Sequence, residues 1–435
     1  MNEIIGKSVL ILGYGAEGQS VHRWLKKFYP DLKIGIADQK LKNRNRSLLT
    51  TSGDSCSNYD TIVKSPGIPP NLPALTAASA KSGSAFGGKA AEKHITSATN
   101  IFFSVCRGKI IAVTGTKGKS TTASLIHAIL SRAYPDVRLV GNIGNPALDY
   151  LDGADKNTLF VIELSSYQLE DLRYGPLVAV ILDIVPEHLD RYRDFESYVA
   201  AKSQIVRFQS PADYVIFNPD HDIPAKIASQ GSARKVRFSP TGPLPASDIP
   251  LLGQGNLENC LAAAAAAKVI GVPSSAIRQA IINFKSLPHR LENIGEYRGI
   301  TFYDDSIATI PQATIHALNA LGEKVETLIA GGFDRGLDYT ELGKFLVNRN
   351  GLKNLILFPD TGAKIWQSVL SAAGKSPLHL MKLPVSSMEQ AVDIAFANTA
   401  KGKICLLSPA AASYNLFKNF EARGDELKQQ ILLYQ

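Results

Sequence analysis

One stretch of sequence decides the fold: Thr114-Gly115-Thr116-Lys117-Gly118-Lys119-Ser120-Thr121. It follows an apolar run at residues 110–113 and precedes a helical pattern. Glycines let backbone N–H groups wrap phosphate oxygens, Lys119 adds positive charge between the phosphates, and Ser120 can place its hydroxyl on Mg²⁺. The motif is not a strict GxxxxGK[ST], because its two glycines lie closer together. We therefore predict a strand, a phosphate-binding loop and a helix, with a plain glycine-rich turn as the alternative.

The same rhythm of apolar run, turn and helical stretch recurs along the chain. Further runs lie at residues 8–12, 33–37, 159–162, 178–182, 214–217, 327–330 and 404–407. Because these runs do not alternate with polar residues, we expect strands buried on both faces, as in parallel sheets covered by helices. The sequence therefore predicts an α/β protein whose chemistry lies at the carboxyl ends of its strands.

Length and composition limit the class of protein. The chain has 435 residues, of which 45% are hydrophobic and 20% charged. At ~150 residues per domain this is room for about three domains. No apolar run approaches the ~20 residues of a membrane span, and the first residues do not resemble a signal peptide. The four cysteines lie far apart, which disfavours a disulfide framework or a zinc knuckle. We expect a cytoplasmic protein that acts without a membrane.

The charge balance bears on possible partners. The formal net charge of +8 is scattered, and the densest basic cluster, at residues 40–46, has no interleaved aromatic residues. Anionic small substrates explain this balance as well as a nucleic acid does. We expect small-molecule substrates, no nucleic-acid partner and a monomer.

Two shifts in composition suggest where domains meet. Residues 71–97 are rich in Ala, Ser, Gly and Lys, and a second break lies at residues 286–288, after a helical pattern. The segment 239–250, rich in Pro, Gly and Ser, is predicted to be an internal loop. The predicted domains are residues 1–97, 98–286 and 287–435.

A second glycine-rich turn lies near the start of the chain. Gly13-Tyr14-Gly15-Ala16-Glu17-Gly18 follows a predicted strand, and Asp38 ends the next one. This pattern is typical of dinucleotide binding, but the diphosphate of a sugar nucleotide can use the same turn. The second phosphate loop favours the sugar nucleotide over NAD. Lys64-Ser65-Pro66-Gly67 either closes over the same ligand or is a plain turn.

Three residues of the central segment are candidates for metal or phosphate chemistry. Glu163 ends a strand, where a carboxylate beside a phosphate loop would hold Mg²⁺. His188 follows another strand end in an acidic loop, which favours a ligand over a structural histidine. Lys202, taken by itself, resembles an ordinary solvated lysine on a helix.

The last segment predicts a polar crevice. Asp304-Asp305-Ser306, residues 331–335 and residues 408–413 each follow a predicted strand. They bring hydroxyls, carboxylates and Arg335, whose planar guanidinium suits a carboxylate or a phosphate. Ordinary turns between strands and helices are the alternative for any one of them.

Taken in order, these motifs resemble the Mur ligases of peptidoglycan synthesis over essentially the whole chain. The matching pieces are Ser65-Pro66-Gly67-Ile68, residues 114–121, Gly141-Asn142-Ile143-Gly144, residues 163–169, His188-Leu189-Asp190-Arg191-Tyr192, Ala201-Lys202, Asn256, Asn259, Pro288-His289-Arg290, Asp305-Ser306, residues 408–410 and residues 418–424. Each piece is modest, and the ordered set is specific.

The resemblance implies a UDP-sugar in a Rossmann-like first domain, MgATP in the central domain, and glutamate in a Rossmann-like C-terminal domain. The implied catalytic residues are Lys119, His188 and Lys202. The implied ATP contacts are Gly115, Thr116, Lys117, Gly118, Lys119, Ser120, Thr121, Asn256, Asn259, Arg290 and Asp305. The implied ligands of two Mg²⁺ ions are Ser120, Glu163, His188 and a carbamylated Lys202. The implied UDP-sugar contacts are Gly15, Ala16, Asp38, Ser65, Pro66, Gly67 and Asn142, and the implied glutamate contacts are Thr309, Arg335, Ser413 and Phe420.

The activity implied by the resemblance is ATP-dependent ligation of glutamate to UDP-N-acetylmuramoyl-L-alanine through an acyl phosphate. The reaction serves cell-wall synthesis, and with it cell shape and division. D-glutamate is favoured. L-glutamate is the alternative, because Ile307 and Arg335 both stand where the D-glutamate pattern has lysine. More distant alternatives are a folylpolyglutamate synthase-like ligase, an NAD-binding regulatory protein and an inactive scaffold.

Overall fold

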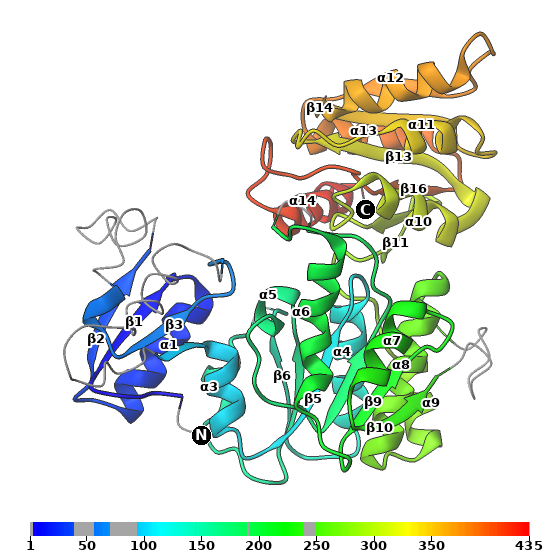
Figure 1. Cartoon of the computed structure of the whole chain (residues 1–435). Helices are drawn as coiled ribbons and strands as arrows, with labels where there is room; N and C mark the ends of the chain where they lie inside the picture. Colours follow the sequence, from blue (N-terminus) through cyan, green and yellow to red (C-terminus); the bar gives the residue numbers. More distant parts are fainter. Residues whose placement is uncertain are drawn as a thin grey trace. The chain divides into compact units, whose positions relative to one another are not determined.

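The computed structural model describes residues 3–38, 56–69, 94–143, 145–188, 191–238, 249 and 251–434. The basic cluster at 40–46 and nearly all of the predicted loop at 239–250 lie outside these residues, as do Gly144, Leu189 and Asp190 of the motifs. The described strands form three sheets (Figure 1). By packing, the chain divides into two units, residues 1–248 with 258–283 and residues 249–257 with 284–435.

The first sheet belongs to the first unit and has four parallel strands in the order β2-β1-β3-β4. Its strands are β1 (Ser8–Leu12), β2 (Lys33–Ala37), β3 (Thr61–Lys64) and β4 (His94–Ser97), and the helices around it are α1 (Ala16–Phe28), η2 (Cys56–Asn58) and α3 (Ala98–Val105). Val9 packs in the same core cluster as Val21 of α1, whereas Leu10 packs in another cluster with Ile62. Both faces of this sheet are therefore covered.

The second sheet, also in the first unit, has six parallel strands in the order β10-β9-β8-β5-β7-β6. Its strands are β5 (Lys109–Thr114), β6 (Val137–Gly141), β7 (Leu159–Glu163), β8 (Val178–Ile181), β9 (Tyr214–Phe217) and β10 (Arg234–Arg237). The helices of this region are α4 (Lys119–Leu130), η3 (Ala147–Tyr150), α5 (Ser166–Leu169), α6 (Phe195–Arg207), α7 (Asp222–Gln230), α8 (Gln254–Ile270) and α9 (Ser274–Ile282). After β5 the chain first fills one side of the sheet and then the other, so a crevice is expected at the carboxyl end of β5.

The third sheet lies in the second unit, in the order β11-β12-β16-β13-β14-β15, with only β11 antiparallel to its neighbour. Its strands are β11 (Glu292–Tyr297), β12 (Ile300–Asp304), β13 (Val325–Gly332), β14 (Asn354–Asp360), β15 (Met381–Pro384) and β16 (Ile404–Leu407). Its helices are α10 (Pro311–Leu321), η5 (Gly322–Lys324), α11 (Thr340–Val347), α12 (Thr361–Ala373), α13 (Met388–Asn398) and α14 (Phe420–Leu432). Neighbouring residues of β13 enter different cores: Leu328 packs with Leu342 of α11, and Ile329 packs with Val392 of α13.

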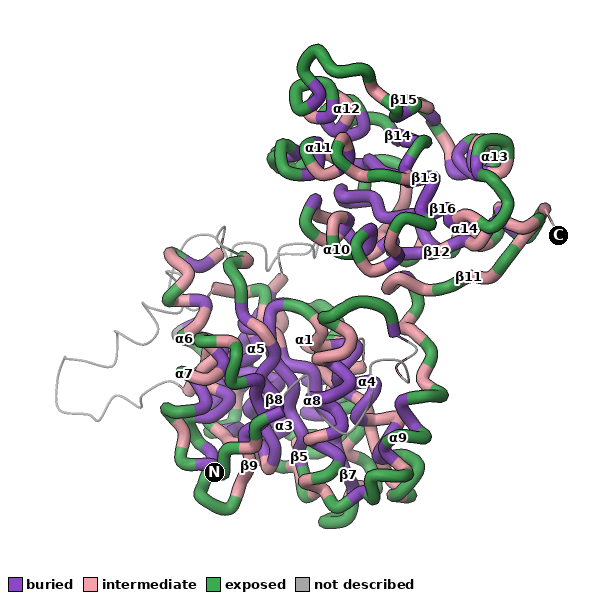
Figure 2. Tube along the Cα trace, turned by 90° about the vertical axis from the view of Figure 1, so that its right-hand side faces the viewer, coloured by how far each residue is buried: buried purple, intermediate pink, exposed green. Residues whose placement is uncertain are grey.

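The predicted α/β class is confirmed. All eight apolar runs are strands, with ends within two residues of the predicted ones. The buried residues follow these strands, as Figure 2 shows for β5 and β8. Among the described helices, none is long and apolar enough to cross a bilayer.

Candidate functional site

The phosphate loop, residues 114–121, has the backbone that its glycines predict. Gly118 has a φ of 81° and stands at the N-terminal cap of α4. A Cβ atom there would lie 2.2 Å from Oδ1 of Asn259, which itself accepts a hydrogen bond from Thr122. Only glycine fits this left-handed position without strain. The loop therefore turns tightly into the start of α4, where helix dipole and N–H groups favour an anion.

Lys119 lies over the loop that it is predicted to serve. Its Nζ donates hydrogen bonds to the carbonyl oxygens of Gly115, at 3.1 Å, and Thr116, at 2.8 Å. The hydroxyl of Thr116 forms hydrogen bonds with the backbone of Val185 and lies 3.1 Å from the hydroxyl of Tyr198. These contacts hold the loop against the residues that follow β8 and against α6. This places a cation where a phosphate chain would be wrapped.

Lys202 lies behind the same loop and is only 1% exposed. Its Nζ donates to the carbonyl oxygen of Gly115 at 2.8 Å and lies 4.8 Å from the centre of the Tyr198 ring. Burial, together with the nearby charge of Lys119, lowers the pKa of Lys202 to about 6. The amine is therefore mostly neutral at pH 7, unlike the solvated lysine that its sequence context suggests.

Glu163 ends β7, the strand beside β5, and is 1% exposed. Its Oε1 accepts a hydrogen bond from Nδ2 of Asn142 at 3.0 Å, whereas its buried Oε2 has no hydrogen-bond partner among the described residues. A buried carboxylate oxygen without a partner is costly. This oxygen fits a divalent cation, and Ser120, at the start of α4, would add a hydroxyl oxygen.

His188 has a backbone φ of 59°, which is uncommon for a residue with a side chain. Its ring lies 5.1 Å from that of Tyr167 and 6.1 Å from that of Tyr198, measured between centroids. The side chain is 43% exposed. It is thus reachable from solvent, close to residues that support the phosphate loop.

Among the described residues, one cluster of three His and acidic side chains has its possible metal-ligand atoms within 4.8 Å of one another. This cluster does not contain the predicted magnesium ligands Glu163 and His188. It consists of His289, Glu292 and Asp304 in the second unit. Lys428 lies 2.7 Å from Glu292 and 3.7 Å from Asp304, and His289 lies 2.7 Å from Asp304. A lysine already balances these carboxylates, so the group forms an ion-pair network.

The predicted UDP-sugar residues gather at the carboxyl edge of the first sheet. Oδ2 of Asp38 accepts a hydrogen bond from the backbone N–H of Tyr14 at 2.6 Å. The hydroxyl of Ser65 donates to the carbonyl oxygen of Gly13 at 2.8 Å. The glycine-rich turn and the 65–67 loop are therefore neighbours. Asn142, predicted to belong with them, instead bonds to Glu163.

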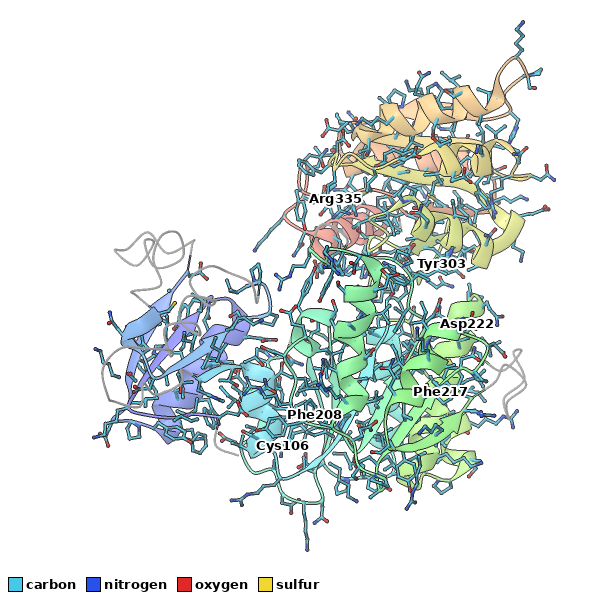
Figure 3. All side chains as sticks on the ribbon, in the orientation of Figure 1. Cys106, Phe208, Phe217, Asp222, Tyr303 and Arg335 are labelled. Atoms are coloured by element: carbon cyan, nitrogen blue, oxygen red, sulfur yellow. The ribbon has the colours of Figure 1, made fainter. Side chains whose placement is uncertain are left out.

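The second unit brings together the predicted glutamate contacts Thr309 and Arg335. Nη2 of Arg335 donates to the carbonyl oxygen of Thr309 at 3.3 Å, and Arg335 is exposed (Figure 3). Asp305, four residues before Thr309 in the chain, accepts hydrogen bonds from the hydroxyl of Ser408, at 3.0 Å, and from the N–H of Leu291, at 3.1 Å. Burial raises the pKa of Asp305 to about 7. Arg290, Asn256, Ser413 and Phe420 also belong to this unit.

Two residues without an assigned role also support these sites. Arg423 is fully buried and donates to the hydroxyl and carbonyl oxygens of Ser306, at 2.9 and 2.7 Å, and to the carbonyl oxygen of Ala411, at 3.1 Å. Glu17 accepts a hydrogen bond from Gln168 of α5 at 2.6 Å and so joins the glycine-rich turn to α5. Glu17 lies in the glycine-rich turn and Arg423 in the 418–424 motif, but their partners Gln168 and Ser306 are more than 100 residues away along the chain. Residue identity alone therefore does not predict these contacts.

A phosphate loop backed by a parallel sheet, with a buried carboxylate on the next strand, defines a nucleotide-binding α/β protein. Residues 113–246 match the Mur ligase middle domain. The UDP-N-acetylmuramoylalanine--D-glutamate ligase of Geobacillus kaustophilus is 35% identical, over 96% of either chain. That of Acetivibrio thermocellus is 32% identical, over 98% of this chain and 96% of its own. The chain belongs to the Mur ligase family, which confirms the resemblance inferred from its motifs.

Solved structures agree with this fold. The UDP-N-acetylmuramate-alanine ligase of Thermotoga maritima gives a TM-score of 0.61 at 16% identity and covers 98% of this chain and all of its own. The MurF ligase of Thermotoga maritima in complex with ADP gives a TM-score of 0.60 at 15% identity, over 98% of this chain and 95% of its own. At such identities the likeness concerns the fold.

Proposed function

We propose that this chain is an ATP-dependent ligase that joins D-glutamate to UDP-N-acetylmuramoyl-L-alanine during peptidoglycan synthesis. The observation that carries the proposal is the match, along nearly the whole chain, to relatives named for that activity. The phosphate loop and the buried Glu163 support the ATP-dependent part, since they offer the contacts that a phosphate chain and its Mg²⁺ need.

The three predicted domains take separate roles in this proposal. Residues 1–97 would hold the UDP-sugar through Gly15, Ala16, Asp38 and the 65–67 loop. Residues 98–286 would hold ATP through the phosphate loop, and residues 287–435 would bring the glutamate. The strands of the three sheets fall within these three ranges, which is compatible with the assignment.

In the first step, the carboxylate of UDP-N-acetylmuramoyl-L-alanine attacks the γ-phosphorus of ATP, and ADP leaves. The product is an acyl phosphate. Lys119 and the N–H groups of the loop neutralise the charge of the transferring phosphoryl group. Bound Mg²⁺ would neutralise more of this charge, held by Ser120, Glu163 and His188.

In the second step, the neutral amine of glutamate attacks the acyl carbon of the acyl phosphate. The carbon–oxygen bond to phosphate breaks, inorganic phosphate leaves, and the nitrogen loses a proton as the amide forms. The role of this chain is to hold the amine near the carbonyl carbon. The guanidinium of Arg335 would pair with a carboxylate of glutamate, and the carbonyl oxygen of Thr309 already orients it.

Carbamylation of Lys202 fits its surroundings. A carbamate forms when a neutral amine attacks CO₂ and loses a proton, and the burial of Lys202 keeps its amine neutral. The product is an anion, which would relieve the closeness of two lysines at the loop. It would also give a second metal ion an oxygen ligand close to the phosphate loop.

The decisive experiment measures phosphate release with ATP, Mg²⁺ and UDP-N-acetylmuramoyl-L-alanine, adding each enantiomer of glutamate separately. We expect release that depends on D-glutamate. Release that depends on L-glutamate alone would support the alternative that Ile307 and Arg335 suggest. No glutamate-dependent release with either enantiomer would reject the proposed function.

A further inference from the structure

Arg191 makes a set of contacts that no assigned role explains. Its Nη1 donates to the carbonyl oxygen of Gly67 at 2.8 Å, and its Nη2 lies 3.2 Å from the carbonyl oxygens of both Pro66 and Ile68. The same Nη2 lies 3.2 Å from Oε1 of Glu170. The side chain is 14% exposed. One guanidinium therefore holds three successive carbonyl groups of the loop predicted to close over the UDP-sugar.

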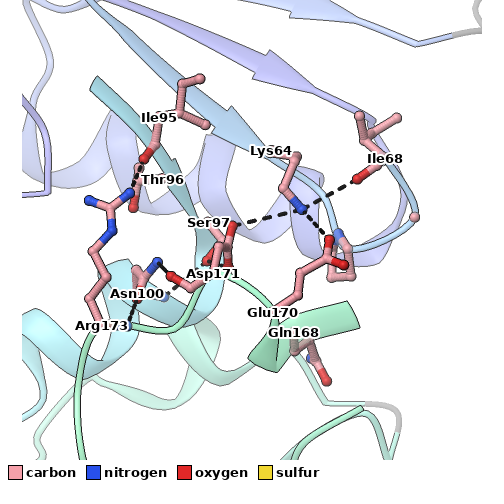
Figure 4. A network of polar contacts seen from close by, with 12 residues as sticks. Lys64, Ile68, Ile95, Thr96, Ser97, Asn100, Gln168, Glu170, Asp171 and Arg173 are labelled. Atoms are coloured by element: carbon pink, nitrogen blue, oxygen red, sulfur yellow. Dashed lines mark hydrogen bonds and ion pairs between the residues drawn. The ribbon is translucent and has the colours of Figure 1, made fainter. Parts of the chain in front are cut away.

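The surroundings of Arg191 fix the plane of its guanidinium and pair its positive charge with a carboxylate. The guanidinium carbon lies 4.7 Å from the centre of the Tyr167 ring. Glu170 also pairs, at 3.1 Å, with Lys64, which is 2% exposed and donates to the carbonyl oxygen of Ile68 at 3.3 Å. Figure 4 shows Lys64 directed toward Glu170 and Ile68. A stacked, paired arginine of this kind keeps one orientation, which an exposed arginine would not.

Arg191 is also tied to the segment that carries His188. Its backbone N–H donates to the carbonyl oxygen of His188 at 3.0 Å. The two ends of this residue thus bind different parts of the first unit: the backbone binds the His188 segment, and the side chain binds the 66–68 loop, more than 120 residues earlier in the chain. The geometry links a predicted metal ligand to the predicted sugar-nucleotide loop.

We propose that Arg191 is a positioning residue for ligation, which holds the 66–68 loop in register with the His188 segment. The inference rests on the proposed function, because it assumes that the loop binds the UDP-sugar and that His188 serves the phosphate chemistry. The acceptor carboxylate must meet the γ-phosphate at close range, and a displacement of about 1 Å can cost on the order of 100-fold in rate. Arginine suits this task because its fork donates to several acceptors at once.

The test compares Arg191→Ala and Arg191→Lys with a matched control in the same segment. Arg193→Ala is that control, since the Arg193 side chain is 89% exposed and pairs with Asp194 at 2.8 Å. For each protein we would measure kcat, the KM values for the UDP-sugar and for ATP, the affinity for the UDP-sugar by calorimetry, and the melting temperature.

For Arg191→Ala we expect kcat to fall at least tenfold and the KM for the UDP-sugar to rise at least tenfold, with the KM for ATP within about twofold of the original. Arg191→Lys should lie between, because lysine keeps the charge opposite Glu170 but cannot hold three carbonyl groups. Arg193→Ala should remain within twofold in every constant.

Two results would overturn the role of Arg191. One is unchanged kcat and UDP-sugar affinity in folded Arg191→Ala and Arg191→Lys. The other is a loss that changes both KM values alike and disappears when the assay is run further below the melting temperature, which would indicate a purely structural role. In contrast, an original protein that binds the UDP-sugar but releases no glutamate-dependent phosphate would reject the proposed function, while calorimetry would still report on Arg191.

Discussion

A buried lysine beside a second lysine is costly unless one of them gives up its proton, and Lys202 lies in that position behind the phosphate loop. Its pKa, lowered to about 6, shows the effect of burial first and of Lys119 second. A neutral amine can still donate to the Gly115 carbonyl oxygen, as observed. The neutral amine is the form that the proposed carbamylation of Lys202 requires.

The first prediction concerns this modification. Lys202→Ala should lose most of the ligase activity and recover part of it when formate or acetate is added, because these anions can replace the missing carboxylate. Initial rates with and without the anions provide the measurement. Lys226→Ala, an exposed lysine on α7, should keep the original rate and show no effect of the anions. Full activity of Lys202→Ala without any anion would rule out the carbamate.

The second prediction concerns Arg335, which is proposed to bind glutamate. Arg335→Ala should raise the KM for glutamate by roughly tenfold or more, about 1.4 kcal/mol, and leave the KM for ATP nearly unchanged. The physical reason is that a guanidinium can hold a carboxylate through two parallel hydrogen bonds. Steady-state kinetics with glutamate as the varied substrate provide the measurement. If Arg335→Lys restores the KM fully, only the charge matters; if Arg335→Ala changes nothing, Arg335 is not in the pocket.

At the scale of elements, the turn from β5 into α4 depends on two glycines, Gly115 and Gly118, and Gly118 directly precedes the helix. Gly118→Ala should abolish binding of an ATP analogue and lower the melting temperature, because its Cβ would meet Asn259 at 2.2 Å and its φ is 81°. Gly153→Ala separates the two causes, the steric contact of the added Cβ and the strain of a positive φ. Gly153 has a φ of 70° with no atom within 4 Å of an added Cβ, so it should cost only the backbone strain, about 1 kcal/mol, with ATP binding intact. Normal ATP binding by Gly118→Ala would contradict this explanation.

The first helix, α1, is joined to α5 through a buried carboxylate. Glu17 accepts a hydrogen bond from Gln168, while its Oε2 has less than 1 Å² of exposed surface and no hydrogen-bond partner among the described residues. Burial raises the pKa of Glu17, and the charge of Asp171 adds to this, whereas Gln168 and Lys64 oppose it. The folded protein therefore binds this proton more tightly than the unfolded chain does.

The fourth prediction follows from that linkage. A raised pKa in the folded state means that the contribution of Glu17 to stability is largest at low pH and is lost as pH rises through the folded pKa. Glu17→Gln keeps the acceptor for Gln168 but removes the titration. Its free energy of unfolding, relative to the original protein, should therefore rise between pH 5 and pH 8 in urea denaturation. Glu389→Gln, an exposed glutamate in the first turn of α13, should show no such trend; a flat difference for Glu17→Gln would contradict the prediction.

Apolar runs predict most of the central strands but miss the central strand β14, and they predict the edge strand β2 but not the edge strands β10 and β15. The run at 404–407 is continuous and apolar because β16 is buried between two strands and two layers of helices. The edge strands β10 and β15 read RKVR and MKLP, and both are mostly exposed. Charged residues and proline are tolerated at an edge because one side of the strand is unpaired. Without burial there is no apolar run to recognise.

The site shows a similar division. Lys119, Ser120 and Glu163 could be predicted because a phosphate loop is local in sequence and its partner carboxylate ends a recognisable strand. Arg191 and Arg423 could not be assigned a role, because most of their acceptors are backbone carbonyl groups, which any residue type can supply. The contact from Arg191 to Gly67 also spans more than 120 residues. Such contacts become visible only when the fold brings the two segments together.

At the scale of the whole molecule, the sugar-nucleotide turn and the phosphate loop belong to different sheets of the first unit. Gly13 follows β1 of the first sheet, and Gly115 follows β5 of the second. The two sheets share one core cluster, which includes Val9 of β1 and Ala112 of β5, but the two loops follow different strands. This separation allows binding and chemistry to be tested independently.

The last prediction uses this separation. Lys119→Ala should abolish ATP-dependent ligation but leave the affinity for UDP-N-acetylmuramoyl-L-alanine within about twofold, because Nζ of Lys119 donates to two carbonyl groups of its own loop, those of Gly115 and Thr116. Removing the cation takes away charge neutralisation during phosphoryl transfer, and that contribution is made in the transition state. Lys226→Ala is the control: this exposed lysine on α7 lies outside the phosphate loop, so ligation should stay near the original rate. Titration calorimetry with the UDP-sugar, beside a phosphate-release assay, provides both measurements. An equal loss of UDP-sugar affinity in Lys119→Ala would mean that the two loops form one site, and the assignment of separate roles to the first two sheets would be wrong.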